Sequence, residues 1–145
     1  MAIEILNESG AECDLDALLS LAQHVILEMG LHPECDLEIS LVDEARMSEL
    51  HVEWMDLPGP TDVLSFPMDE LEPHSAPDGP GIIGDIVLCP QFAEQQAKTS
   101  LRDELLLLTA HGIMHCIGYD HAEPEEEKVM FELQEKIVSD WKKSQ

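Results

Sequence analysis

The sequence predicts a single domain that combines helices with a small set of β-strands. The chain of 145 residues is long enough to bury a core and short for two domains. Short runs with strand character alternate with longer segments that repeat apolar residues at helical spacing. No internal repeat, low-complexity tract or linker separates parts of the chain. We therefore expect residues 1–145 to form one domain.

In the first part of the chain, predicted strands and helices alternate. Apolar residues alternate with polar ones over 2–7 and 36–42, which predicts two strands. Helical spacing over 15–29, followed by a glycine, predicts an amphipathic helix. A second helix is expected over 43–54, and a short strand over 63–66 is bounded by prolines that cannot continue a ladder.

The middle of the chain contains a predicted loop and a fourth strand. Residues 68–81 mix acidic residues with prolines and glycines, which is typical of a loop. The run IIGDIVL, 82–88, is apolar on both faces and predicts a central strand. Helical character resumes near Gln91 and fills most of the remaining chain, with a final helix that starts near Pro124.

The helix predicted over 100–118 carries the most distinctive residues. Ser100 and Asp103 resemble a capping box, which marks the start of the helix. Apolar residues surround this helix, so we expect it to be buried in the domain. His111 and His115 on such a helix need partners, because an unpaired imidazole in a core is costly.

His111, His115 and His121 have the spacing of a metal site. The first two are four residues apart, so both rings lie on one helical face and can reach one cation. Gly118 supplies the turn that would bring His121 back toward them. Three neutral nitrogens leave a fourth position for water, which is typical of catalytic zinc. Metzincin peptidases share this spacing, but Gly112 stands where they carry a glutamate base, which disfavours peptide hydrolysis.

The charge of the chain limits its partners. There are 31 acidic residues and 7 Lys and Arg, which gives a formal charge of −24. This charge disfavours binding to anionic membranes and to DNA. It also argues against a broad basic surface for nucleic acid. A nucleic-acid substrate would therefore require a local cleft, a bound cation or a basic partner.

Other features favour a cytoplasmic protein. The N-terminal MAIEILNESG lacks the basic region and apolar run of a signal peptide, and no apolar stretch is long enough to cross a membrane. The cysteines Cys13, Cys35, Cys89 and Cys116 form no C-x-x-C pair, so reduced thiols are expected.

Three blocks of the sequence resemble the YbeY family of ribosomal-RNA maturation endoribonucleases. HGIMHCIGYDH at 111–121 is similar to the family signature, which is close to H-G-x-L-H-L-x-G-Y-D-H. PTDVLSFP at 60–67 and GDIVLCP at 84–90 resemble two further family blocks in the same order. The resemblance covers most of the chain. It implies an α+β domain in which a mixed sheet of about four strands packs with about five helices.

The resemblance also implies a function and a cofactor. The activity is metal-dependent cleavage of single-stranded RNA, in maturing the 3′ end of small-subunit rRNA and in ribosome quality control. One zinc ion would be held by His111, His115 and His121, and the partners would be precursor rRNA and ribosomal or small-subunit assembly proteins. Many members carry an arginine after an aromatic residue shortly before the P-T-D block. Here the pair is Trp54-Met55, which weakens the expected contact with phosphate.

Outside the histidines, Asp85 is the candidate catalytic residue. It lies in an otherwise apolar strand, where a carboxylate needs a partner, and it could orient a zinc ligand or move a proton. A structural role for Asp85 is equally open. The weaker candidates are Glu104, seven residues before His111, and the turn residues Thr61, Asp62 and Asp120.

Two alternatives to the endoribonuclease stay open. A metallopeptidase is favoured by the histidine spacing and disfavoured by Gly112. A non-catalytic zinc-binding assembly factor that docks on the pre-ribosome gains weight from Met55. The sequence does not choose between water and the ribose 2′-hydroxyl as the attacking group.

Overall fold

A computed structural model gives the fold of the chain and describes residues 3–57, 59, 61–119 and 123–145. Within these residues, four strands form one sheet in the order β1-β2-β4-β3. The strands are β1 (Ile3–Asn7), β2 (Asp36–Leu41), β3 (Val63–Pro67) and β4 (Ile82–Leu88). β1, β2 and β4 are parallel, and β3 is antiparallel to β4. The expected α+β class with a mixed sheet is confirmed, and the apolar run at 82–88 is an interior strand.

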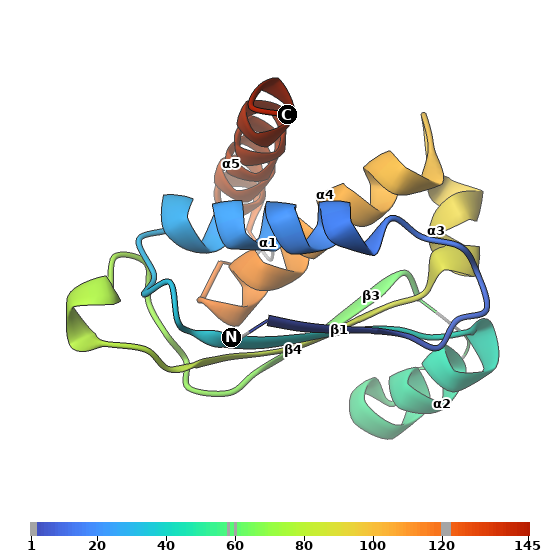
Figure 1. The fold of residues 1–145 in the computed structure, drawn as a ribbon. Helices are drawn as coiled ribbons and strands as arrows, with labels where there is room; N and C mark the ends of the chain where they lie inside the picture. The colour runs from blue at the N-terminus through green and yellow to red at the C-terminus, as the bar shows by residue number, and fades with distance from the viewer. Residues whose placement is uncertain (1–2, 58, 60, 120–122) are drawn as a thin grey trace.

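Helices cover the two faces of the sheet unequally. The helices are α1 (Leu15–Glu28), α2 (Glu44–Met55), α3 (Pro90–Gln96), α4 (Leu101–Cys116) and α5 (Pro124–Lys143). α1 and α4 lie over one face with α5 beyond them, and α2 lies on the opposite side near one end of the strands (Figure 1). The predicted loop contains one short 3-10 turn, Ala76–Asp78. The helical segment predicted near Gln91 is the separate helix α3, because the backbone becomes extended at Ala97.

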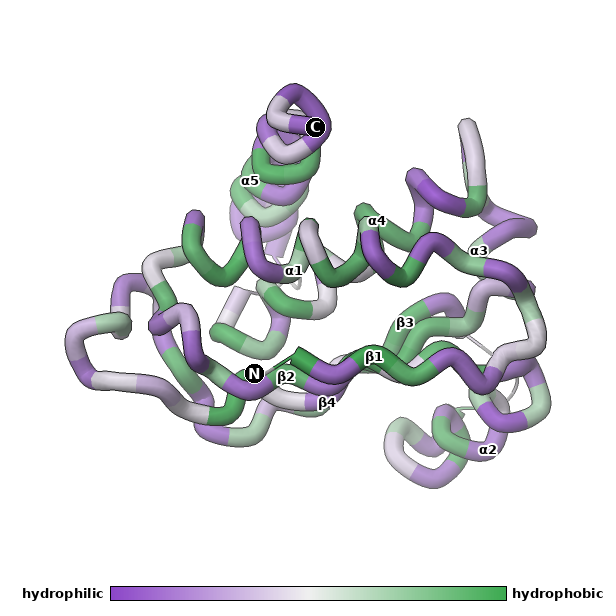
Figure 2. Tube along the Cα trace, in the orientation of Figure 1, coloured by the Kyte–Doolittle hydropathy of each residue, from purple (hydrophilic) through white to green (hydrophobic). Residues whose placement is uncertain are grey.

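The main core lies between the sheet and α1, α4 and α5. Its fully buried side chains include Val25 of α1, Ile39 of β2, Ile86 of β4 and Ile113 of α4. Apolar residues recur along these elements (Figure 2). A smaller cluster on the other face packs under α2 around Met47. Because successive strand residues point to opposite faces, Ile86 and Leu88 of β4 join the main core and Val87 joins the smaller one.

Local signals set the limits of α4. The Ser100 hydroxyl accepts a hydrogen bond from the Asp103 backbone N–H at 3.1 Å, which confirms the predicted cap. After Cys116 the chain turns at Gly118, whose φ of 103° suits glycine. The four cysteines Cys13, Cys35, Cys89 and Cys116 are free thiols. No described helix is both long enough and apolar enough to cross a membrane.

Candidate functional site

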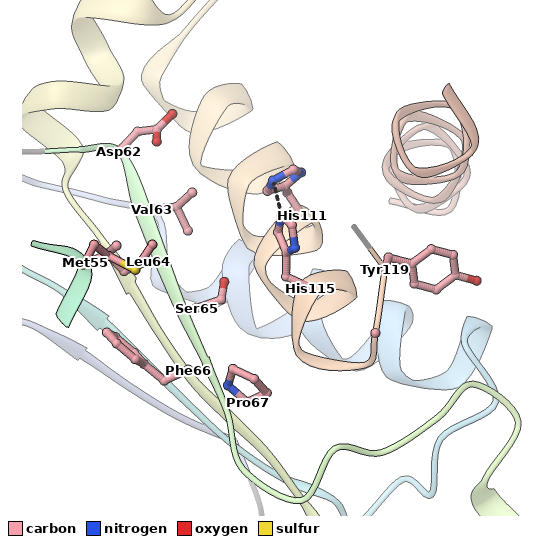
Figure 3. Close-up of a pocket in the computed structure, with 11 residues that line it drawn as sticks. Met55, Asp62, Val63, Leu64, Ser65, Phe66, Pro67, His111, His115 and Tyr119 are labelled. Carbon is pink, nitrogen blue, oxygen red and sulfur yellow. Dashed lines mark hydrogen bonds between the residues drawn. The ribbon is translucent and has the colours of Figure 1, made fainter. Parts of the chain in front are cut away.

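A cleft of about 620 Å³ opens between β3 and the C-terminal half of α4. Figure 3 shows the side chains of β3 on one side and the two histidines of α4 on the other. The described residues that line it are Met55, Asp62, Val63, Leu64, Ser65, Phe66, Pro67, His111, His115, Gly118 and Tyr119.

His111 and His115 converge in this cleft. Their Nε2 atoms lie 3.0 Å apart, and the ring centroids are 4.5 Å apart in an edge-to-face arrangement. Two nitrogens bound at about 2.05 Å to one tetrahedral zinc ion would lie about 3.3 Å apart. The observed separation is close to this value, so the pair fits two positions of a single metal ion. His111 and His115 therefore lie together on one face of α4, as predicted.

Two side chains of α5 hold the His111 ring. His111 Nδ1 lies 2.8 Å from the Oε1 atom of Gln134, a side chain that is only 5% exposed. An amide oxygen only accepts, so Nδ1 of His111 donates this bond, and Nε2 of His111 accepts the 3.0 Å hydrogen bond from Nε2–H of His115 (Figure 3). Phe131 stacks on the same ring, with a centroid separation of 5.8 Å and an interplanar angle of 21°. Metal-bound histidines commonly donate their second N–H to such an acceptor.

The third predicted ligand, His121, lies outside the described residues, as does Asp120. Within the described part of the chain, no three His, Cys, Asp or Glu side chains are grouped so that they could hold a metal ion. Tyr119, two residues before His121, still lines the cleft. The case for a metal thus rests on the two converging nitrogens, and the role of His121 stays a prediction.

Gly112 allows α4 to pack closely against the sheet. A Cβ atom added at Gly112 would lie 3.0 Å from Ile86 Cγ2 and 3.1 Å from Ser65 Oγ. These distances are shorter than ordinary van der Waals contact, so a larger side chain would push α4 away from β3 and β4. The glycine that occupies the position of the peptidase glutamate therefore has a packing role of its own.

The structure separates the two candidate aspartates. Asp62 lines the cleft, and its Oδ1 accepts a 3.3 Å hydrogen bond from the Thr61 hydroxyl. Asp85 pairs with Phe66 in the sheet and precedes Ile86, which points toward α4. Since neighbouring strand residues face opposite ways, Asp85 points to the other side of the sheet. It lines a groove there, so the structure does not bring it together with the histidines, and this placement lends no support to a catalytic role.

Glu104 is close to the site without lining the cleft. Burial raises the pKa of its carboxyl, and the nearby charge of Asp62 raises it further, while Lys98 lowers it. Glu104 lines a separate cavity between α3, α4 and α5 that also contains Lys98. The Glu104 carboxyl therefore responds to the charge of Asp62 from outside the cleft.

Sequence reasoning missed the residues of α5 that support His111. Gln134 was detectable in principle, because it interrupts an apolar stripe formed by Met130, Ile137 and Trp141 at helical spacing. A polar residue in such a stripe needs a buried partner. Phe131 carried no comparable signal, since a lone aromatic residue on a helix is ordinary.

The fold and the cleft define a small α+β protein that brings two histidines together at an open site. The family model described as Endoribonuclease YbeY matches residues 4–142. The chain belongs to this family, which confirms the family expected from the three sequence blocks and places the chain among the endoribonucleases.

Named relatives and a solved structure agree with this assignment. Proteins named Endoribonuclease YbeY from Rhodococcus opacus and Rhodococcus erythropolis are 56% and 57% identical, and each alignment covers 97% of this chain and 82% of the relative. The protein of the same name from Mycolicibacterium smegmatis is 56% identical over 97% of this chain and 83% of its own. A Thermotoga maritima protein with a solution structure has a TM-score of 0.64 and 30% identity, over 96% of this chain and 88% of that one.

Proposed function

We propose that the chain is a zinc-dependent endoribonuclease that cleaves single-stranded rRNA precursors, in maturation of the 3′ end of small-subunit rRNA and in ribosome quality control. One observation carries the proposal. The Nε2 atoms of His111 and His115 lie 3.0 Å apart in an open cleft, in a chain of an endoribonuclease family.

The residues that would hold zinc are His111, His115 and His121. Bound zinc supplies Lewis-acid polarisation of a phosphoryl oxygen and lowers the pKa of a bound water. Gln134 fixes the proton on Nδ1 of His111, and Phe131 restrains the plane of its ring. Together they fix the His111 ring with its Nε2 facing Nε2 of His115 at 3.0 Å, and a bound metal would replace the hydrogen bond between these two atoms.

Asp62 is proposed to move the proton. It is the only carboxylate among the described residues that line the cleft. It would accept the proton of the attacking hydroxyl, whether of water or of the ribose 2′ position, as the new P–O bond forms. The same proton then passes to the ribose oxygen whose P–O bond breaks, so Asp62 ends as it began. Asp85, on the other face of the sheet, takes no direct part.

The charge of the chain supports a need for partners. No Lys or Arg is present among the described residues that line the cleft. With a net charge of −24, the protein lacks the counterion release that drives most RNA binding. We therefore propose that basic ribosomal or small-subunit assembly proteins deliver the precursor, and that the enzyme acts in the cytoplasm.

The test is cleavage of precursor rRNA by the wild-type chain and by the His115→Ala variant. The wild type should cut free precursor slowly and cut it faster within assembled small-subunit particles, and a chelator should abolish both reactions. His115→Ala should be inactive in both. An intact precursor under every condition, with the protein folded and zinc-loaded, would instead favour the non-catalytic assembly factor. Chelator-sensitive hydrolysis of casein without RNA cleavage would favour the peptidase.

A further inference from the structure

The cleft that contains the histidines and a second groove lie on either side of β3. Each cavity measures about 620 Å³, and Ser65, Phe66 and Pro67 line both of them. β3 is an edge strand of the described sheet, with the cleft on its α4 side and the groove on its α2 side. At the end of α2, Met55 lines the cleft and Trp54 lines the groove. An extended ligand in the cleft can therefore reach the groove.

On the groove side of this shared wall, an exposed tryptophan packs on the half-buried Phe66. Trp54 is 60% exposed and packs edge-to-face on Phe66, with ring centroids 5.8 Å apart at 68°. Met55 and Met68 beside it are also more than half exposed. By contrast, Trp141 in the core is 2% exposed. A large indole left in solvent beside an open cleft is unusual for a packing residue and suits a surface that binds a flat apolar ligand.

We propose that Trp54 and Phe66 form a stacking subsite for an unpaired nucleobase of RNA whose backbone occupies the cleft. This inference rests on the proposed function and names the part of the substrate that the second groove holds. Stacking on an aromatic ring accepts any base and requires no positive charge. That property matches a chain whose cleft has no Lys or Arg among its described lining residues.

The charged residues of the groove restrict where an RNA backbone can lie. Arg46 is the single Lys or Arg among the described residues that line either cavity. Its 3.1 Å salt bridge to Glu49 is exposed, so exchange for an RNA phosphate costs little. Glu38 and Asp85 line the part of the groove above β2 and β4 and repel a backbone there. The strand of RNA is thereby confined to the side formed by α2 and β3.

The test measures binding separately from cleavage. A 2′-O-methyl oligoadenylate and an abasic oligonucleotide of equal length are titrated into the purified full chain while tryptophan emission is followed. Trp54 is the exposed indole and Trp141 is buried, so quenching reports on the proposed subsite. The variants are Trp54→Leu, which removes the ring, Trp54→Phe, which keeps one, and the remote control Leu27→Ala, which removes an exposed apolar side chain from α1. Binding by the variants is measured by anisotropy of labelled oligonucleotide.

The expected result is quenching by the oligoadenylate and none by the abasic chain. Trp54→Leu should bind the oligoadenylate roughly tenfold more weakly, whereas Trp54→Phe and Leu27→Ala should stay near wild type.

Equal binding by Trp54→Leu, or equal binding of the abasic chain, would overturn the subsite. So would a wild-type dimer that becomes a monomer in Trp54→Leu, because the patch would then be an interface between copies. If the wild type still cleaves precursor rRNA, the proposed function survives those results; if it neither binds nor cleaves RNA, both proposals fail.

Discussion

At the scale of single residues, the groups that would hold a metal and the group that would move a proton come from different elements. His111 and His115 lie on α4, their support Gln134 lies on α5, and Asp62 immediately precedes β3. The sequence identified the two histidines because a spacing of four is a local property of a helix. It favoured Asp85 over Asp62 because a carboxylate in an otherwise apolar strand is visible in a sequence. The face of the sheet toward which that carboxylate points depends on the packed structure.

The two aspartates give a matched pair of variants. Asp62→Asn should lower the rate of precursor cleavage by about 100-fold or more, because the amide cannot accept the proton of the attacking hydroxyl. Asp85→Asn should cleave at a rate close to wild type, because its side chain faces the other side of the sheet. Single-turnover cleavage of a labelled precursor, with zinc content checked for each protein, measures both. A large loss in Asp85→Asn with an unchanged Asp62→Asn would reverse the assignment.

Gln134 should act on zinc affinity through His111. Gln134→Leu keeps the volume but removes the acceptor for His111 Nδ1–H, so zinc affinity should fall by about 10- to 100-fold. Gln134→Glu retains an acceptor and should stay close to the wild-type affinity. Competition with a chromophoric chelator gives the dissociation constants, and circular dichroism confirms the fold. Unchanged affinity in a folded Gln134→Leu protein would show that the hydrogen bond does not orient the ligand.

At the scale of elements, the close packing of α4 on β3 and β4 places the histidines at the edge of the sheet. The sequence predicted this helix, its Ser100 cap and its burial, because each follows from local pattern. It did not predict the support from α5, because contacts between helices depend on crossing geometry that no local pattern encodes. His121 lies outside the described residues, so its expected place in the site is still a prediction.

Substitutions at Gly112 should show how closely α4 packs on the sheet. Gly112→Ala should change the free energy of unfolding by less than about 1 kcal/mol, because better helix propensity offsets the tight contacts with Ile86 and Ser65. Gly112→Glu should lose about 3 kcal/mol or more, because a carboxylate would be forced against the sheet. Urea unfolding measures both. A Gly112→Glu protein as stable as wild type would show that α4 has room for a glutamate there.

At the scale of the whole molecule, a strongly acidic protein belongs to a family of enzymes that act on a polyanion. The charge of −24 was evident from composition and indicated a need for a cation or a basic partner. The structure adds where RNA would have to be bound locally. The histidine cleft and the neighbouring groove both lie against β3. The mixed sheet of about four strands followed from the family resemblance, whereas the order of the strands was not predicted, since pairing between distant strands cannot be read from periodicity.

The central claim is that His111, His115 and His121 together hold one zinc ion, and the most direct measurement is the zinc stoichiometry of the purified chain. Elemental analysis of protein dialysed against trace zinc should give one zinc per wild-type chain. His115→Ala and His121→Ala should each lose most of the metal, while His74→Ala, in the exposed loop before β4, should keep it. A wild-type chain without stoichiometric zinc, or a His115→Ala chain that retains it, would contradict the account.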